Sequence, residues 1–342
     1  MTPAGTPDPL NREAPLDALA APLTPTAHFY RRSHFPVPRV DPAAWRLRVG
    51  GEVRRPLALT LADLRAMPGR TLAVTLECAG NGRNLMEPTP HGTPWGLGAV
   101  STADFTGVPL RHVLELAGPG SSAVEVLFEG ADRGPVGAGR EEPFARSLPL
   151  AAAAGGDALL AWAMNGEPLP AAHGFPLRLV VPGWYGMASV KWLADVRVLA
   201  EPFRGHFQAE HYVYVGEAGT PEGTPVARAR VRSLIASPAD GAAVPLGPVE
   251  LRGIAWSGHA PVARVEVSVD DGATWAAAEL GEPPSPHAAA PWSLAWLPPR
   301  RGEYRVLLRA ADLAGNVQPE VPVVNALGYG NNCIQRVRLS VV

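Results

Sequence analysis

The pattern of apolar and polar positions along the chain changes at about residue 226. Before that point, short apolar segments of helical or strand-like character alternate with long loops rich in glycine and proline. Because an apolar residue at every second position marks a half-buried strand, the region after that point predicts an all-β fold without helices. Its expected strands are 231–236, 249–255, 263–269, 274–280, 292–296, 304–311 and 334–342.

The first region carries the signal of a short helix. Thr60 is followed three residues later by Asp63, which is the pattern of a capping box. The helix that starts there must end before Pro68, because the residue preceding a proline avoids the helical conformation. Alternation over 45–49 predicts a strand just before this helix.

A second group of elements surrounds Cys78. Residues 71–77 predict a buried strand that leads directly into Cys78 and a glycine-rich loop. Residues 110–117 predict a helix that ends at Gly118. Further strands are expected over 124–128 and 177–181.

We therefore expect two folded domains behind an N-terminal segment. A mixed α+β domain covers 28–225, and an all-β domain covers 226–342. The strand and turn spacing of the second domain is typical of an immunoglobulin-like β-sandwich, although the Cys…Trp…Cys pattern of antibody domains is missing. Residues 1–27 are rich in proline, alanine and threonine without a period, which predicts a tail or a wrapping arm.

Composition and charge exclude several classes of protein. The chain has 342 residues, 46% of them hydrophobic, which suits a globular protein of two domains. Its formal net charge of −2 gives no overall attraction to nucleic acid or to a membrane surface. No run approaches the roughly 18 apolar residues of a membrane-spanning helix. Two cysteines, Cys78 and Cys333, are too few for a disulfide framework.

The N-terminal sequence favours a cytoplasmic protein. It carries acidic residues and prolines where a signal peptide needs basic and then apolar residues. Arg31 and Arg32 look superficially like a twin-arginine export signal, but no apolar run follows them.

Reactive and charged side chains concentrate in short segments that also contain glycine or proline. Glycine lets the backbone approach a ligand closely, and proline fixes the shape of a loop. The segments together offer a thiol, two imidazoles and several cations, a set that suits a large anionic ligand and a soft metal. They cover residues 32–38, 77–83, 173–178 and 183–192.

These segments resemble those that hold the cofactor in the sulfite oxidase family. Cys-Ala-Gly-Asn at 78–81, followed by Arg83, resembles the family's molybdenum-ligand loop. Arg-Ser-His-Phe-Pro-Val-Pro, His-Gly-Phe-Pro-Leu-Arg and Ser-Val-Lys-Trp-Leu resemble its other cofactor-contacting segments and occur in the family's order. Residues 207–212 resemble the segment with the family's active-site tyrosine, and 316–319 resemble the end of its dimerisation domain. The resemblance covers about residues 28–342.

The resemblance implies a mononuclear molybdenum–molybdopterin cofactor and a role for each matching residue. Cys78 would bind the molybdenum as a thiolate. The residues expected to hold the pterin and its phosphate are His34, His173, Arg178, Ser189 and Lys191, the chain's only lysine. The residues expected to face a small oxyanion substrate such as sulfite are Arg32, Arg83 and Tyr212. Their positive charge would stabilise charge that develops during oxygen-atom transfer.

The resemblance also implies partners, and this sequence departs from the family at the substrate pocket. The family's N-terminal haem domain is missing and the sequence contains no Cys-x-x-Cys-His, so electrons would pass to an external acceptor such as a cytochrome. The C-terminal domain would form a homodimer. Leu327 stands where the animal and plant enzymes have a further arginine, and Asp104-Phe105 stands where they have a tryptophan. These departures weaken the expectation that sulfite is the physiological substrate.

Two alternatives for the function remain open at the level of sequence. The same site could reduce a sulfoxide or nitrate. A non-catalytic β-sandwich binding protein would instead use the Cys78 loop structurally. A lone cysteine or histidine usually has a structural role, and a lone arginine is usually a solvated surface charge. Tyr212 could likewise be a packing residue, and Cys333 is expected to be one. A cysteine hydrolase is disfavoured, because no histidine near Cys78 is identifiable as its base.

Overall fold

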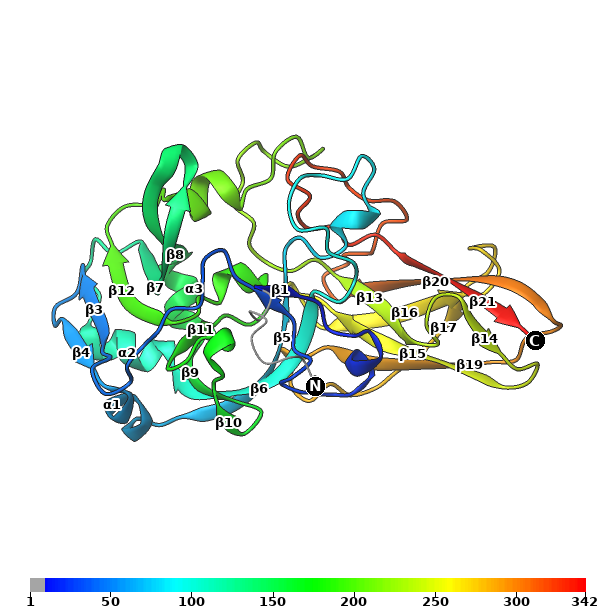
Figure 1. Cartoon of the computed structure of the whole chain (residues 1–342), viewed down its shortest axis with the longest axis horizontal. Helices are drawn as coiled ribbons and strands as arrows, with labels where there is room; N and C mark the ends of the chain where they lie inside the picture. The colour runs from blue at the N-terminus through cyan, green and yellow to red at the C-terminus, as the bar shows by residue number, and fades with distance from the viewer. Residues whose placement is uncertain (1–9) are drawn as a thin grey trace.

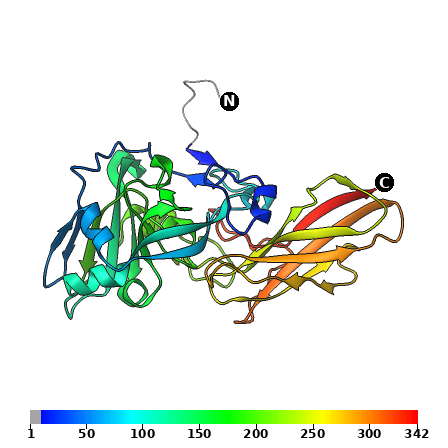
Figure 2. The ribbon, with the colours of Figure 1, turned by 90° about the horizontal axis from the view of Figure 1, so that it is seen from below.

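A computed structural model describes residues 10–342 (Figure 1). Strands β1–β12 and helices α1–α3 form one half of an elongated molecule, and β13–β21 form the other half (Figures 1 and 2). The C-terminus lies at the far end of the second half (Figure 1). Within residues 10–342, no helix is long and apolar enough to cross a membrane.

The first half contains two five-stranded sheets. One has the order β10-β9-β6-β5, with β11 paired to β9, and the other has the order β4-β3-β12-β7-β8. In the second sheet β12 runs parallel to β3 and antiparallel to β7. The strands are β3 (Leu47–Gly51), β4 (Leu57–Leu59), β5 (Arg70–Glu77), β6 (Val100–Pro109), β7 (Glu125–Val136), β8 (Arg140–Pro149), β9 (Leu159–Met164), β10 (Glu167–Pro168), β11 (Arg178–Val180) and β12 (Leu193–Leu199).

Local sequence signals explain where the short helices begin and end. The side chain of Thr60 accepts from the Asp63 backbone, and that of Asp63 accepts from the Thr60 backbone, so the capping box starts α1 (Leu61–Ala66) as expected. Helix α2 (Leu110–Ala117) ends at Gly118, whose φ of 67° is left-handed and favours glycine. Helix α3 (Leu150–Gly155) completes this half.

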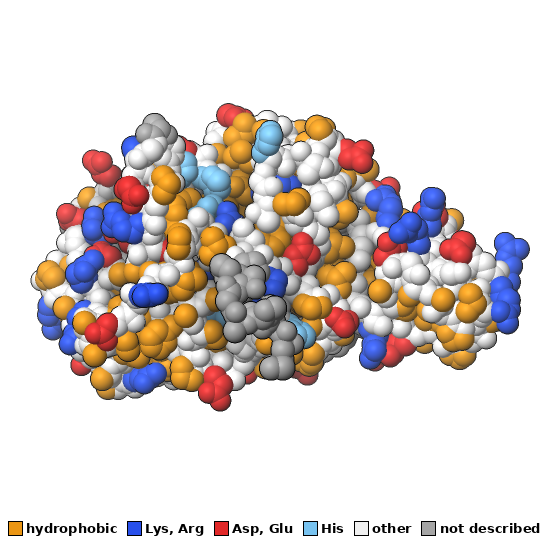
Figure 3. Space-filling view, viewed as in Figure 1, with side chains coloured by type: hydrophobic (Ala, Val, Ile, Leu, Met, Phe, Trp, Pro, Cys, Tyr) orange, Lys and Arg blue, Asp and Glu red, His pale blue; other side chains and the backbone are white. Residues whose placement is uncertain are grey.

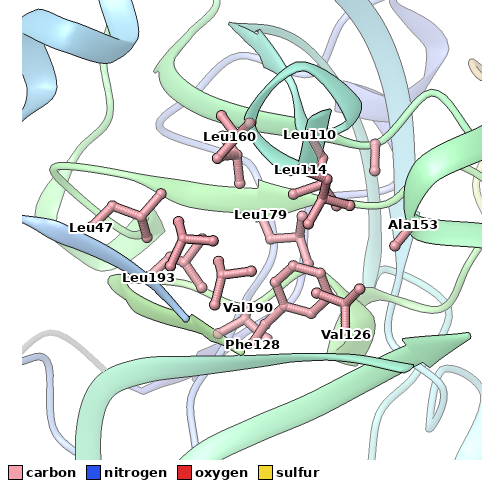
Figure 4. Packing of buried hydrophobic residues seen from close by; sticks show 14 of the residues in the cluster. Leu47, Leu110, Leu114, Val126, Phe128, Ala153, Leu160, Leu179, Val190 and Leu193 are labelled. Carbon is pink, nitrogen blue, oxygen red and sulfur yellow. The ribbon is translucent and has the colours of Figure 1, made fainter. Parts of the chain in front are cut away.

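The main hydrophobic core lies between these two sheets and α2 (Figure 4). Leu160 and Leu179 come from the first sheet, Phe128 comes from the second, and Leu114 comes from α2. Each is at most 2% exposed. Full burial of one such side chain contributes about 1.5–3 kcal/mol, so this core fixes the scaffold that carries the loops.

The second half consists of two facing sheets, with the orders β13-β15-β19-β18 and β14-β21-β20-β16-β17. Leu251 and Trp292 from the first sheet and Val265 and Val337 from the second belong to one buried cluster. The strands are β13 (Arg232–Ser237), β14 (Ala242–Val244), β15 (Val249–Trp256), β16 (Val262–Ser268), β17 (Ala276–Ala277), β18 (Glu279–Leu280), β19 (Ala290–Trp296), β20 (Gly302–Asp312) and β21 (Gln335–Val341).

The single strand expected over 274–280 is wrong. The chain crosses here from one sheet to the other, because β17 pairs with β16 whereas β18 pairs with β19. Ala278 lies at the crossing point, packs against the core of the second half, and donates its N–H to the Val265 carbonyl at 2.9 Å.

The described part of the N-terminal segment is an arm packed on the folded chain. Strand β1 (Asn11–Arg12) pairs antiparallel with β2 (Arg31–Arg32). Leu19 is buried in a cluster with Leu234 of β13 and Ile254 of β15. Residues 1–9 of the expected tail lie outside the described residues. The arm therefore contacts both halves of the molecule.

Candidate active site

One cavity in the first half brings together eight of the nine side chains singled out from the sequence. Its hollow encloses about 670 Å³ of space, a volume that includes open solvent. The singled-out residues on its wall are Arg32, His34, Cys78, His173, Arg178, Ser189, Lys191 and Tyr212. Arg83 does not belong to this wall.

Cys78 is the first residue after β5 and lies on the cavity wall. Its N–H donates to the Ala99 carbonyl at 2.8 Å, and its carbonyl accepts from Asn81 at 2.9 Å, so the loop turns tightly around the thiol. Burial raises the pKa of the Cys78 thiol, and the Gly80 N–H together with nearby arginines opposes that shift. A bound cation that replaced the proton would relieve the cost of burying a thiolate here.

Buried cations crowd one end of the cavity. Lys191 Nζ donates to Ser33 Oγ at 2.6 Å and to the Arg32 carbonyl at 3.0 Å. Arg178 donates to the carbonyls of His173 at 3.1 Å and Ser189 at 3.3 Å. Its Nε has no hydrogen-bond partner in the described part of the chain. Burial, with Arg178 nearby, lowers the pKa of Lys191 to about 7. An anion bound here would offset the repulsion between the Lys191 ammonium and the Arg178 guanidinium.

Two short turns place these groups. His173 closes the 3₁₀ turn Ala171–His173, and Gly174 follows it with φ of 107°. A Cβ at Gly174 would come within 3.2 Å of the Lys191 backbone, so glycine allows this close approach. Ser189 follows the 3₁₀ turn Gly186–Ala188, and its Oγ accepts from the Val181 N–H at 3.0 Å. Burial and then Arg178 lower the pKa of His173 to about 3, so its imidazole is neutral near pH 7.

A guanidinium, an imidazole and a phenol also meet on the cavity wall. The Tyr212 hydroxyl lies 2.8 Å from His34 Nε2, and Arg32 Nη2 lies 3.1 Å from His34 Nδ1. Burial and then Arg32 lower the pKa of His34 to about 2, whereas burial raises the pKa of Tyr212. The tyrosine hydroxyl is therefore protonated near pH 7 and is a donor toward a group in the cavity or toward His34.

Arg83 is buried beside the cavity and is held by the protein backbone. It donates to the Thr93 carbonyl at 2.8 Å and to the Leu327 carbonyl at 3.1 Å. Its guanidinium lies 5.3 Å from the centre of the Tyr329 ring. The Leu327 side chain packs against the same aromatic cluster, which includes Tyr212. Arg83 is thus oriented toward backbone carbonyls near Leu327, a relationship with no local sequence signal.

Sequence reasoning missed Asp132, which also lies on the cavity wall. It is 4% exposed, and its Oδ1 has no hydrogen-bond partner among residues 10–342. Burial raises its pKa to about 7, and Lys191 opposes the shift. Asp132 lies where the pairing of β7 with β8 shifts register, and no pattern in the sequence indicates this irregularity.

The chemistry of the cavity fits a metal that arrives with ligands of its own. No group of three or more His, Cys, Asp or Glu side chains within residues 10–342 is placed to hold a metal ion. Cys78 therefore offers a single thiolate, which suits a soft metal, and the remaining ligands must come from a bound molecule. The cation-rich end suits a phosphate, and the hydrogen-bonding atoms of Asp132 and Arg178 without partners suit a polar ring system.

Comparisons with known proteins agree with this chemistry. The family described as "Oxidoreductase molybdopterin binding domain" matches residues 34–207, and the "Mo-co oxidoreductase dimerisation domain" matches residues 224–342. Sulfite oxidase of Gallus gallus is 40% identical over 94% of this chain and 74% of its own length. Mitochondrial sulfite oxidase of Mus musculus is 39% identical over 98% of this chain. The chain spans 64% of the length of that mouse relative.

Two further relatives differ in the function that their names give. A nitrate reductase of Phaseolus vulgaris is 34% identical over 97% of this chain and 41% of its own length. The crystal structure of the sulfane dehydrogenase SoxCD from Paracoccus pantotrophus superposes with a TM-score of 0.82 and 29% identity. That match covers 98% of this chain and 86% of the other. The chain therefore belongs to the sulfite oxidase family of molybdopterin-binding oxidoreductases.

Proposed function

We propose that this chain transfers an oxygen atom to or from a small sulfur oxyanion such as sulfite and exchanges electrons with an external acceptor. The observation that carries the proposal is the meeting of Cys78, Arg32 and Tyr212 on one cavity wall. These groups provide a metal-binding sulfur, a fixed positive charge and a hydroxyl donor, which are the functions that the reaction needs from the protein.

When bound, the molybdenum–molybdopterin group supplies the oxygen-atom transfer and the two-electron chemistry. Cys78 would hold the metal at the end of β5. Lys191, Arg178 and His173 would hold the phosphate-bearing end, with Ser189 fixing the turn between them. His34 also lies on the cavity wall, where it would contact the cofactor while it holds the Tyr212 hydroxyl.

Arg32 would bind and orient the oxyanion, because its Nη2 reaches His34 and its side chain lies on the cavity wall. The Tyr212 hydroxyl would donate to an oxygen of the substrate. Arg83, held by backbone carbonyls, would act from beside the cavity through its charge. The buried aromatic side chains around Tyr212 lower the polarity of its surroundings, which strengthens these charge interactions.

One observation favours a second candidate, the reduction of nitrate or a sulfoxide. Leu327 supplies no charge near Tyr212, and the Arg83 guanidinium already donates to backbone carbonyls. The site would therefore bind a dianionic substrate weakly. Loss of one charged hydrogen bond costs about 1.5–3 kcal/mol of binding. The absence of this charge costs a monoanion or a neutral S-oxide less binding free energy than it costs sulfite.

Paired assays separate the two candidates. The cofactor-loaded protein is given sulfite with an artificial one-electron acceptor, and separately nitrate or an S-oxide with a reduced dye. Faster turnover of sulfite supports the leading proposal, and faster turnover of nitrate or the S-oxide supports the second. Failure of every substrate, in protein that contains molybdenum, would contradict both.

The proposal extends to organisation and assembly. We propose an arm over 1–27, a catalytic domain over 28–225 and an immunoglobulin-like dimerisation domain over 226–342. The family match over residues 224–342 supports a homodimer. Light scattering at micromolar concentration should give twice the mass of the chain, and a monomer mass would contradict the dimer.

A further inference from the structure

His34 forms part of two hollows. It lies on the wall of the cavity that contains Cys78, and it also lines an open cleft with about 700 Å³ of empty space. The cleft lies beside the tip of the β7–β8 hairpin, where histidine side chains are visible at the surface (Figure 3). Its wall includes Phe207 and two more histidines, His206 and His211. His34 therefore lies between the cavity and the cleft.

The three imidazoles form a continuous series from the cavity to the surface. The His34 and His211 ring centres are 5.0 Å apart, and those of His211 and His206 are 5.6 Å apart. His206 Nδ1 lies 3.0 Å from an oxygen of Glu210, whose side chain is 54% exposed. On the cavity side, the series begins at the Tyr212 hydroxyl. Ring centres at these distances place neighbouring imidazoles in contact, and the open cleft beside them has room for water.

Local sequence explains why these groups lie together. The π-helical turn Phe207–His211 carries His211 at its end, directly before Tyr212, and His206 at its start. Arg146 holds this turn by donating to the carbonyls of Phe207 and Val226. The wider turn of a π-helix brings His206 and His211 to one side, facing the cleft.

The proposed reaction requires a proton route. Oxidation of sulfite by one water molecule forms an S–O bond, breaks both O–H bonds of water, and releases two protons and two electrons. The two electrons would pass, by way of the bound cofactor, to two molecules of an external one-electron acceptor such as a ferric haem protein. The protons are released inside a cavity crowded with buried cations, where charge cannot accumulate.

We propose that the cleft is the proton route of the active site and that His211 and His206 carry protons between His34 and solvent. The imidazoles of His211 and His206 can each accept a proton on one nitrogen and release one from the other, so these two groups conduct without moving far. Glu210 then passes the proton to water. The inference rests on the proposed function only for the direction of proton flow.

The charges around His211 fit a carrier that does not trap the proton. Burial, followed by His206, Arg32, Arg83 and Arg146, lowers the pKa of His211 to about 4. Glu210 faces His206 and is also 3.6 Å from Arg140. The positive charges of the three arginines therefore repel a proton on His211. The Glu210 carboxylate at the surface attracts it.

Rapid-mixing measurements on the cofactor-loaded chain test the route directly. Weakly buffered protein is mixed with excess sulfite and a pH-indicator dye, so that cofactor reduction and proton release are recorded together. A second arm reduces the oxidised cofactor with a substrate-independent electron donor and records the accompanying proton uptake. The variants are His211→Gln and the more superficial His206→Gln, and the control is His259→Gln, an exposed histidine of the second half.

Proton release in the parent protein and in the control should keep pace with cofactor reduction. In His211→Gln it should lag at least roughly tenfold, because a positioned acid–base group commonly contributes about 10²–10⁴-fold. Added imidazole should restore the rate, which a merely structural defect would not allow. Wild-type proton rates in both glutamine variants would overturn the inference. If sulfite reduces no variant, the proposed function fails, and the proton-uptake arm still decides the route.

Discussion

Arg232 of β13 donates its Nη1 to Glu77 Oε1 at 3.0 Å, directly beside Cys78. Both side chains are at most 2% exposed. Trp256 and Asn81 donate to the same carboxylate at 2.9 and 3.0 Å, and Arg232 also donates to the Asn331 carbonyl at 2.7 Å. The second half of the molecule therefore holds the end of β5 and the loop that presents the Cys78 thiol.

Replacing Arg232 with methionine should destabilise the whole chain. The change leaves the Glu77 carboxylate buried without its charge partner, and breaking one side of such a pair costs about 3–5 kcal/mol. The free energy of unfolding from urea titration measures the loss. Arg338→Met is the matched control, because its pair with Asp240 is exposed to solvent, and it should change little. Equal effects of the two variants would contradict the role given to Arg232.

Glu13 should stabilise the loop beyond Cys78. Its carboxylate accepts from the N–H groups of Gly96 and Gly98, and Ala14 donates to the Gly98 carbonyl at 2.8 Å. Glu13→Ala leaves these donors without their partner, at a cost of about 1–3 kcal/mol. Hydrogen exchange at Gly96 and Gly98 should become faster, while exchange in β20 should not. Unchanged exchange at both glycines would show that the arm does not hold the loop.

Anion binding by the cofactor-free protein should weaken as the pH rises through about 7. Burial lowers the pKa of Lys191 to that value, so its ammonium is present below pH 7 and lost above it. Asp132, whose pKa burial raises to about 7, becomes negative over the same range and acts in the same direction. Calorimetry with inorganic sulfate, which does not titrate here, measures the change.

Substitutions separate the two groups behind this pH dependence. Lys191→Arg keeps its charge at every pH used, so its sulfate affinity should fall less with pH. Asp132→Asn should remove the other contribution. An affinity in the parent protein that stays constant between pH 6 and 8.5 would contradict the assignment of Lys191 to the anion-binding end.

Loss of the Tyr212 hydroxyl should impair turnover more than stability. Tyr212→Phe keeps the ring in its aromatic cluster but removes the donor beside His34 and Arg32. A hydrogen bond to a charged substrate is worth about 1.5–3 kcal/mol, so kcat/KM should fall by roughly tenfold to a hundredfold. Tyr304→Phe, whose hydroxyl contacts only the Arg300 carbonyl in the described structure, is the control. A normal kcat/KM in Tyr212→Phe would make this residue a packing residue.

Elements with local signals could be predicted from the sequence, whereas elements set by distant pairing could not. The capping box at Thr60 and the glycine stop at Gly118 act within a few residues, and α1 and α2 form where they were expected. Strands β6 and β9 were missed because they are buried inside a sheet and lack clear alternation. The crossing between sheets near Ala278 likewise depends on partners far along the chain.

In the candidate site, too, features marked by local motifs could be predicted, whereas features set by distant contacts could not. Eight predicted side chains share a cavity, because ordered motifs mark the loops that carry them. The orientation of Arg83 depends on a carbonyl at Leu327, more than two hundred residues away, so its sequence motif could not indicate it. Asp132 and the histidine cleft were missed for a related reason, since a register shift and a π-helical turn place their side chains.

X-ray absorption at the molybdenum edge of the cofactor-loaded protein tests the central claim, a bond between the Cys78 sulfur and the metal. Cys78→Ser is compared with Cys333→Ser, which alters the other buried cysteine. The account predicts that Cys78→Ser loses one sulfur neighbour of molybdenum together with the thiolate absorption band, while Cys333→Ser keeps both. An unchanged sulfur shell in Cys78→Ser would contradict it.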